Sequence, residues 1–373
     1  MTDLSRISVV LPSLDPDEKL IAVIDGLLEQ GFSHIILVND GSKPENLHYF
    51  TEQAEQHPEI HLLHHEVNRG KGAALKTAFT WFLQNRPEGI GVVTVDGDNQ
   101  HHPADTRACC ENMLKTGHVT LGCRDFNQAD VPARSSFGNK TTSMVFKIFV
   151  GMTISDTQTG LRAIPRDALE ILNTVAGDRF EYETNMLLAF KTNAIAFDEV
   201  KIRTVYIEEN ASSHFHPIRD SWRIYKLILA HFFRYTLSSI ASFFVDSGCV
   251  YLLNLLLHGI LQDPLLSAAT TCGARAISSV LNFFMNKTLV FRANVSTGKA
   301  MLRYYALCIP QMAAQWLLNQ GIYTLFHIGE DAAALRTLVH ILVMCVLFIL
   351  SFTIQQRWVF APKKSTKEES KKC

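Results

Sequence analysis

Two aspartates separated by one residue are the first candidates for chemistry. Asp96 and Asp98 lie in "VVTVDGDNQHHP" (92–103), where an apolar run ends in acidic and amide side chains. Alternate side chains of a strand point the same way, so both carboxylates can converge beyond its carboxyl end. Such oxygen ligands suit Mg²⁺ or Mn²⁺, with substrate phosphate and water completing the shell, and Gln100 adds a neutral oxygen. Because D-x-D pairs also cap helices and turns, a purely local role is the alternative.

Two further polar positions follow apolar runs. Asp40 ends "ILVND" and would lie near Asp96 if the two strands are neighbours. It would then bind a nucleobase or ribose, or simply shape the turn. Lys71 follows a glycine turn in "NRGKGAALKTA", but Leu75 occupies the third glycine position of a dinucleotide fingerprint. Lys71 is therefore expected to touch a base or phosphate, or only to start a helix.

Up to about residue 226, predicted strands alternate with predicted helices along the chain. Short apolar runs indicate strands, separated by amphipathic helical stretches; they cover 7–12, 34–40, 60–67, 91–96 and 118–124. This order predicts an α/β domain with a mostly parallel sheet covered on both faces, and ligands at the carboxyl ends of its strands.

The composition changes after residue 226. Four apolar stretches follow, each reaching the roughly 20 residues that span a bilayer; they cover about 230–257, 264–285, 304–327 and 334–354. Lysine and arginine gather between the second and third stretches and in the tail, which places those segments and the α/β domain in the cytoplasm. The predicted division is a catalytic domain (1–222), a membrane domain (223–360) and a lysine-rich tail (361–373). A large helical core of a soluble protein is the alternative.

Composition excludes several other classes. The chain has 373 residues, with 35 Lys+Arg against 36 Asp+Glu, so no basic field favours nucleic acid. Its eight cysteines form no CxxC pair, which indicates reduced thiols without a zinc site or disulfide framework. The N-terminus does not resemble a signal peptide.

Six motifs then carry a family resemblance. They occur in the order "VVLPSLDPDEKL", "VNDGS", "NRGKGAAL", "VDGDNQHHP", "GCRDF" and "SDTQTGLRAIP". Over about 220 residues the chain resembles family 2 glycosyltransferases of the GT-A (Rossmann-like) fold, especially polyprenyl-phosphate sugar synthases such as dolichol-phosphate mannose synthase. The remainder resembles a GtrA-type domain of four transmembrane helices, through "ARAISSVLNFFMNKTLVF" and "FTIQQRWVF".

The resemblance implies an inverting hexosyltransferase that moves a sugar from a GDP-mannose or UDP-glucose type donor to a polyprenyl (dolichyl or undecaprenyl) phosphate. The lipid-linked product would serve cell-envelope glycosylation, and the enzyme would lie in the inner (cytoplasmic) membrane with both termini cytoplasmic. Its partners would be the nucleotide sugar, the polyprenyl phosphate and the membrane, without nucleic acid. Both a monomer and a homo-oligomer are compatible with the sequence.

The resemblance also implies roles for particular residues. Mg²⁺ or Mn²⁺ would be held by Asp96, Asp98 and Gln100. The nucleotide sugar would be bound by Pro12, Asp17, Asp40, Lys71, Asp96 and Asp98. The acceptor phosphate would be held by Arg124 and Arg134, with Arg203 or Arg219 as further cations, and the catalytic set is Asp98, Arg124 and Arg134. On the sugar side would lie Asp156, Gln158 and Glu181, with Glu183 in the same "FEYE" stretch; for Asp156 a structural role is equally compatible.

Several alternatives stay open. Near Asp17, the family's Asn-Glu pair is replaced, so the carboxylate that meets the nucleoside is undecided. Arg219 and its neighbours would otherwise only anchor an interfacial helix on anionic lipid. Five polar residues in the spans are expected to face the bundle interior, either lining a lipid path or bonding between helices; they are Asp246, Asn254, Arg275, Asn282 and Asn286. The rival functions are a lipid-sugar flippase or scaffold, and a processive polysaccharide synthase.

Overall fold

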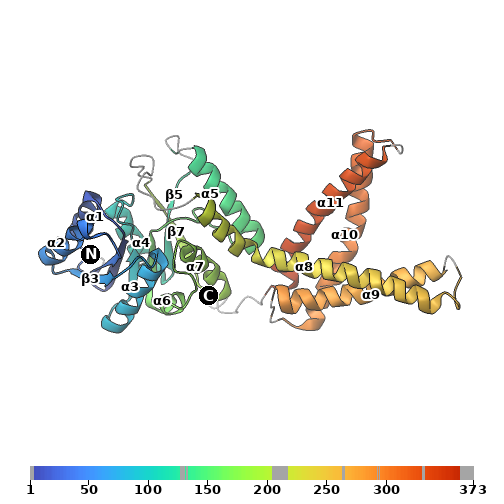
Figure 1. Cartoon of the computed structure of the whole chain (residues 1–373), viewed down its shortest axis with the longest axis horizontal. Helices are drawn as coiled ribbons and strands as arrows, with labels where there is room; N and C mark the ends of the chain where they lie inside the picture. The colour runs from blue at the N-terminus through green and yellow to red at the C-terminus, as the bar shows by residue number, and fades with distance from the viewer. Residues whose placement is uncertain are drawn as a thin grey trace, which may run out of the picture. The chain divides into compact units, whose positions relative to one another are not determined.

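The computed structural model divides the chain into two compact units, Met1–Leu227 and Ile228–Cys373 (Figure 1). It describes residues 4–126, 131, 133–203, 217–262, 265–291, 293, 295–329 and 332–361. At a few helical positions only the backbone is described, and these include Arg134 and Arg219. Each unit is built around its own packed interior, so the two are considered separately.

A seven-stranded sheet forms the centre of the first unit. Its strands are β1 (Ile7–Ser13), β2 (Ile35–Asp40), β3 (Ile60–His65), β4 (Gly91–Thr94), β5 (Val119–Arg124), β6 (Arg162–Pro165) and β7 (Phe197–Ile202). They lie in the order β3-β2-β1-β4-β6-β5-β7, and β6 is antiparallel to both its neighbours. The remaining pairs are parallel. This is the GT-A-like α/β arrangement that the resemblance implied.

Successive side chains of a strand point to opposite faces of the sheet, and in β1 and β2 both sets are mostly apolar and buried, so helices cover both faces. On one face, the core cluster joins α1 (Glu18–Glu29), α2 (His48–Gln56) and α4 (Pro103–Thr116) with Val9 and Leu11 of β1. α3 (Lys71–Asn85) also packs on β1 and β2, and it contacts α6 (Arg166–Leu172) and α7 (Glu181–Thr192). The short helix η1 (Pro44–Asn46), α5 (Ala133–Val145) and the π-helix η2 (Phe146–Val150) complete the unit.

The structure differs from the predicted strands and their expected order in three ways. β4 ends at Thr94 and not at Asp96, so the two aspartates lie in a turn where Asn99 has φ 59°. β2 and β4 are not neighbours, since β1 lies between them. β6 and β7 are not among the predicted strands, because β6 has only four residues and three of the six residues of β7 are charged.

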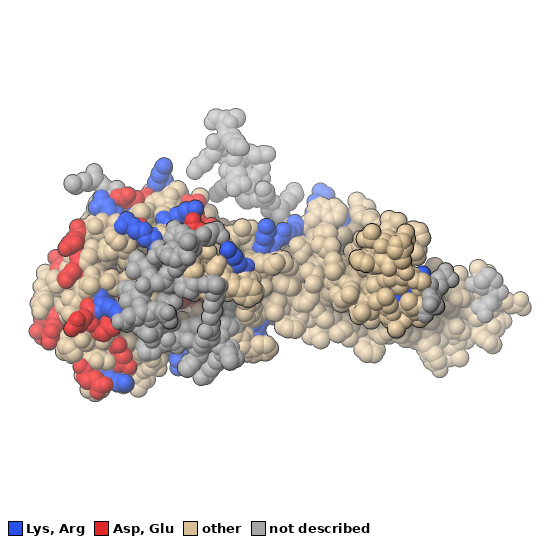
Figure 2. Space-filling view, turned by 90° about the horizontal axis from the view of Figure 1, so that it is seen from above, with Lys and Arg blue, Asp and Glu red and all other residues tan. Residues whose placement is uncertain are grey.

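The second unit consists of four long helices. They are α8 (Pro217–Leu257, which begins in the first unit), α9 (Leu265–Met285), α10 (Thr297–Leu325) and α11 (Ala333–Ile354). Two of the described helical stretches, Ile228–Leu257 and Ala333–Val359, are long and apolar enough to cross a bilayer. Large apolar side chains such as Phe244 and Trp316 are more than half exposed. The face of this unit seen in Figure 2 carries few charged side chains, as expected of a surface in contact with lipid.

The two halves of this helical unit repeat one another. Arg234-Tyr235 of α8 corresponds to Arg303-Tyr304 of α10, and Val290-Phe291 to Val359-Phe360, all with the same difference in residue number. In each half the second helix ends in a π-helix, η4 (Asn286–Val290) or η5 (Gln355–Val359). The unit is therefore built from two hairpins of one design.

The hairpins are joined by a buried polar network at the two π-helices. Asn286 is fully buried, accepts a hydrogen bond from Ser238 Oγ at 2.8 Å and donates to Gln355 Oε1 at 3.1 Å. Gln355 in turn donates to Tyr235 Oη at 3.1 Å. Buried amide groups whose hydrogen bonds are made with one another can join helices inside an apolar interior.

The prediction that polar residues of the spans face the interior is correct for some of them. Asn286 is buried, and Asn282 donates to Ser242 Oγ at 2.9 Å. For Asn254 the prediction is wrong, because that residue is exposed. Arg275 is also largely exposed, although its guanidinium lies 3.5 Å from Asp246.

Candidate functional site

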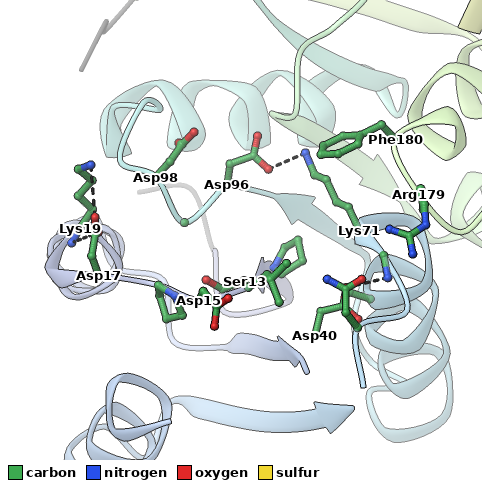
Figure 3. Close-up of a pocket in the computed structure, with 17 residues that line it drawn as sticks. Ser13, Asp15, Asp17, Lys19, Asp40, Lys71, Asp96, Asp98, Arg179 and Phe180 are labelled. Carbon is green, nitrogen blue, oxygen red and sulfur yellow. Dashed lines mark hydrogen bonds and ion pairs between the residues drawn. The ribbon is translucent and has the colours of Figure 1, made fainter. Parts of the chain in front are cut away.

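A pocket of about 280 Å³ opens beyond the carboxyl ends of β1, β2 and β4 (Figure 3). Strands of a parallel sheet end at one edge, so residues far apart in sequence meet there. The predicted metal ligand Gln100 does not line this pocket, whereas all the residues predicted to bind the nucleotide sugar do: Pro12, Asp17, Asp40, Lys71, Asp96 and Asp98. The other lining residues include Ser13, Asp15 and Lys19, from the end of β1 to the start of α1, and Arg179 and Phe180, just before α7. Carboxylates and cations face each other across it, an arrangement suited to a polar anionic ligand.

The turn after β4 places both aspartates in this pocket. Asp98 accepts a hydrogen bond from the backbone N–H of Gln100 at 3.1 Å, which closes the turn. Asp96 packs against Gly160, and a β-carbon on that glycine would lie 2.2 Å from Asp96 Oδ2. Gly160 was not predicted as a site residue. A glycine inside "QTGLR" gives no sign in the sequence that it faces the turn after β4.

Lys71 joins the aspartate turn to α7. Its Nζ lies 2.7 Å from Asp96 Oδ1 and 3.0 Å from Glu183 Oε1. The lysine is the first residue of α3, and its side chain extends toward Asp96 (Figure 3). The structure thus gives Lys71 two acidic partners within the protein, in addition to its predicted place near the donor.

The charges of this cluster influence one another. Burial alone would raise the pKa of Asp96, but the Lys71 ammonium and His101 outweigh burial and hold this pKa well below its usual range. Burial and the negative charge of Asp96 raise the pKa of Asp98. Burial would lower the pKa of Lys71, yet Asp96 and Glu183 together raise it. Lys71 alone therefore does not relieve the repulsion between the two aspartates.

The donor set fits a hard divalent cation. No group of three or more His, Cys, Asp or Glu residues suited to a metal occurs in the described part of the chain. Mg²⁺ and Mn²⁺ sites often use only one or two protein carboxylates and take phosphate oxygens of the substrate for the rest. Asp96 and Asp98 supply two such carboxylates in the pocket and match that chemistry.

Asp40 is engaged by the protein itself. Its Oδ1 lies 2.7 Å from His65 Nδ1 and accepts the N–H of Arg69 at 3.0 Å, while Oδ2 accepts the N–H of Gly70 at 2.8 Å. Gly70 has φ 100°, which favours glycine. Asp40 therefore lines the pocket and also fixes the loop that carries Lys71.

The loop after β1 forms the opposite wall. Asp17 caps α1, accepting the N–H of Lys19 at 3.0 Å. Asp15 accepts the N–H of Lys43 at 2.8 Å, and its own N–H donates to Ser42 Oγ. Asp15 thus ties this loop to the loop after β2, and Asp17 and Pro12 complete the wall.

Comparison with known proteins identifies the chain. Residues 8–172 match the family "Glycosyl transferase family 2", and residues 234–360 match "GtrA/DPMS, transmembrane domain". The protein is a family 2 glycosyltransferase fused to a GtrA-like membrane domain. It is accordingly an enzyme of the hexosyltransferase class, associated with a membrane.

Three relatives illustrate the similarity. The protein MJ1222 of Methanocaldococcus jannaschii is 28% identical over 233 residues, 61% of this chain and 93% of the relative. The UDP-N-acetylglucosamine–dolichyl-phosphate N-acetylglucosaminyltransferase of Methanococcus voltae is 27% identical over 54% of this chain and 86% of its own length. The undecaprenyl-phosphate mannosyltransferase of Micrococcus luteus is 22% identical over 54% and 84%. The last two relatives are named for different sugars.

In this glycosyltransferase Arg124 is held by a buried carboxylate. Its Nε donates to Asp156 Oδ2 at 2.7 Å and its Nη2 to Oδ1 at 3.2 Å, a bidentate pair. Asp156 is fully buried and also accepts the N–H of Gln158 at 3.1 Å. Asp156 thus orients the arginine, and the Gln158 side chain is exposed.

The other predicted acceptor cations are placed unequally. Arg203 follows β7, and its side chain, 58% exposed, lies 3.5 Å from Asp105. The side chains of Arg134, at the start of α5, and Arg219, near the start of α8, lie outside the described part of the structure. Glu181 begins α7, and its Oε2 is buried without a hydrogen-bond partner among the described residues.

Proposed function

We propose that this glycosyltransferase transfers a hexose, with inversion, from a nucleotide sugar of the UDP-glucose or GDP-mannose type to a polyprenyl phosphate. The observation that carries the proposal is the pocket in which Asp96, Asp98 and Lys71 converge beyond the sheet edge. Relatives named for dolichyl-phosphate and undecaprenyl-phosphate transfer support the choice of acceptor. The lipid-linked sugar would supply cell-envelope glycosylation.

The chain's own groups would position the reactants. The donor diphosphate would lie between Lys71 and the aspartate turn, and the nucleoside against Pro12, Asp17 and Asp40. Asp96, Asp98 and a Gln100 oxygen would hold Mg²⁺ or Mn²⁺, which when bound neutralises the charge that develops on the diphosphate. A phosphate monoester has a second pKa near about 6 and is anionic at neutral pH, so a strong general base is unnecessary.

The acceptor phosphate needs fixed cations, because it approaches an anionic donor. Arg124 would supply one guanidinium in an orientation set by Asp156, and Arg134 another from α5. Arg203 and Arg219 would add charge nearer the membrane. Asp156, Gln158 and Glu181 would border the sugar. Catalysis would then depend mainly on positioning and electrostatic stabilisation.

The membrane unit would anchor the enzyme with four spans and present the acceptor. Its buried Asn286–Gln355 network favours interhelical bonding over a lipid path, since these polar groups are satisfied by one another. The basic loop before α10 and the tail would face the cytoplasm, with the catalytic unit, by the positive-inside rule.

The test is transfer of radiolabelled hexose to polyprenyl phosphate in detergent, from UDP-glucose and GDP-mannose separately, with Mg²⁺ or Mn²⁺. Asp98→Asn should lower the rate at least about 100-fold, because it removes one of two metal carboxylates. Asp25→Asn, an exposed aspartate on α1, is the matched control and should leave the rate unchanged. Donor binding without lipid-soluble product would instead favour the flippase or scaffold.

A further inference from the structure

One lysine is shared by two carboxylates at the heart of the site. Lys71 Nζ lies within hydrogen-bond distance of Asp96, a proposed metal ligand, and of Glu183, which is not one. An ammonium has three donors, so it can keep one partner while it leaves the other. The Lys71 and Glu183 side chains are only 18% and 13% exposed. Leaving either charge without a partner would therefore be costly.

The backbone of Lys71 is held in place by the packing of α3 on α7, whereas its ammonium lies at the end of a flexible side chain. A β-carbon on Gly72 would lie 2.6 Å from Tyr182 Cβ, so the first turn of α3 packs tightly on the start of α7. The N–H of Ala73 donates to Asp178 O at 2.9 Å, which holds the same turn. The four-carbon stem of lysine can nevertheless move its charge between neighbouring acceptors.

A second cation lies beside Glu183. The fully buried Arg162 donates from Nη1 to the backbone carbonyl of Glu183 at 2.8 Å. Its Nη2 has no hydrogen-bond partner among the described residues. Glu183 therefore has a buried positive charge beside its backbone in addition to the Lys71 ammonium.

We propose that Lys71 is an internal counter-cation of the metal site and that Glu183 is its second position. Without a divalent ion, Lys71 neutralises Asp96. When a divalent ion binds Asp96 and Asp98, Lys71 remains with Glu183 alone, and Glu183 thereby acts as a positioning residue for the metal site. The inference rests on the proposed function only in the assignment of the metal to Asp96 and Asp98.

The experiment measures Mn²⁺ binding to the full chain in detergent, without donor or acceptor, by electron paramagnetic resonance of the free ion. Lys71→Met removes the competing cation and should tighten Mn²⁺ binding. Glu183→Gln removes the second position, so displaced Lys71 would have no anion, and binding should weaken at least about tenfold. Glu170→Gln, an exposed glutamate on α6, makes no ion pair with Lys71 in the described structure and should change the dissociation constant less than about twofold.

The double variant Lys71→Met, Glu183→Gln decides between the proposal and a general charge effect. If Glu183 acts through Lys71, the double variant should bind Mn²⁺ as tightly as Lys71→Met. The proposal would be overturned if the double variant bound Mn²⁺ more weakly than the wild type by the same factor as Glu183→Gln. It would also be overturned if Glu183→Gln bound Mn²⁺ as tightly as the wild type, or if the wild-type chain bound no Mn²⁺. Since no sugar transfer is measured, failure of the proposed reaction would leave this result readable.

Discussion

Asp156 and Asp98 serve different purposes in this enzyme because their neighbours differ. Asp156 is fully buried and is bonded to Arg124 and a backbone amide, so it acts by orienting an arginine. Asp98 faces the pocket with its pKa raised by burial and by Asp96. The same side chain is a fixed support in the first case and a binding group in the second.

Gly160 allows a direct test of the position of Asp96. In Gly160→Ala the new β-carbon would lie 2.2 Å from Asp96 Oδ2, so the carboxylate must move. We expect hexose transfer to fall at least about tenfold, as displacement of a positioned group does. Gly298→Ala, where a β-carbon meets nothing within 4 Å, should transfer at the wild-type rate. Normal transfer by Gly160→Ala would show that the Asp96 position is not critical.

Asp156→Asn tests the support of Arg124. Loss of the carboxylate removes one partner of a mostly buried pair, so we expect a loss of about 2 kcal/mol in the free energy of unfolding. Transfer should fall as well, through a higher KM for polyprenyl phosphate. Denaturant unfolding and initial rates measure the two effects. The control Glu111→Gln breaks the half-exposed Arg107–Glu111 pair and should cost less than about 1 kcal/mol.

At the scale of elements, short departures from regular structure place the functional groups. β4 ends two residues before Asp96, and the turn that follows brings both aspartates into the pocket. α3 begins at Lys71 directly after a glycine with φ 100°. In the membrane unit, the π-helices η4 and η5 turn Asn286 and Gln355 toward each other.

Asn286→Leu tests the junction of the two hairpins. The substitution leaves Ser238 and Gln355 each without one buried partner, and an unsatisfied buried polar group costs about 1–3 kcal/mol. The melting temperature in detergent should therefore fall by several degrees. Asn254→Leu, an exposed asparagine on α8, should melt like the wild type. Equal melting of all three proteins would exclude the network as a determinant of stability.

At the scale of the whole molecule, one chain combines an α/β unit that has a charged surface with a helical unit that has an apolar surface. Charged side chains are frequent on the face of the first unit in Figure 2 and sparse on that of the second. Even numbers of spans return the chain to its starting side, so each repeated hairpin would do so by itself if both of its helices cross the membrane. The two π-helices are therefore expected at the same, cytoplasmic side.

Cysteine labelling tests this topology in intact cells. In a background with the eight native cysteines replaced by alanine, Gln262→Cys and Gly329→Cys should react with a membrane-impermeant maleimide. Lys299→Cys should react only after the membrane is permeabilised, since it lies in the first turn of α10, on the side predicted to be cytoplasmic. All three residues are exposed, so burial does not bias the comparison. Labelling of Lys299→Cys in intact cells would reject four spans with cytoplasmic termini.

The sequence by itself determined the fold class and the polar positions near the strand ends. Apolar runs locate β1 to β5 within a few residues because burial on both faces demands continuous apolar sequence. For the same reason the long apolar stretches locate α8 to α11. "VDGDNQ" indicated Asp96 and Asp98 because alternate side chains beyond a buried strand can converge on one ion, with a local capping role as the alternative.

Only the tertiary structure decided which partners these residues have. Gly160 touches Asp96, Glu183 shares Lys71, and Asp156 holds Arg124 through contacts between segments distant in sequence. The antiparallel β6, which separates β4 from β5, depends on the same long-range pairing. Periodicity reports the environment of each residue, whereas a contact depends on how the whole chain packs, so the charges within the site follow from the fold.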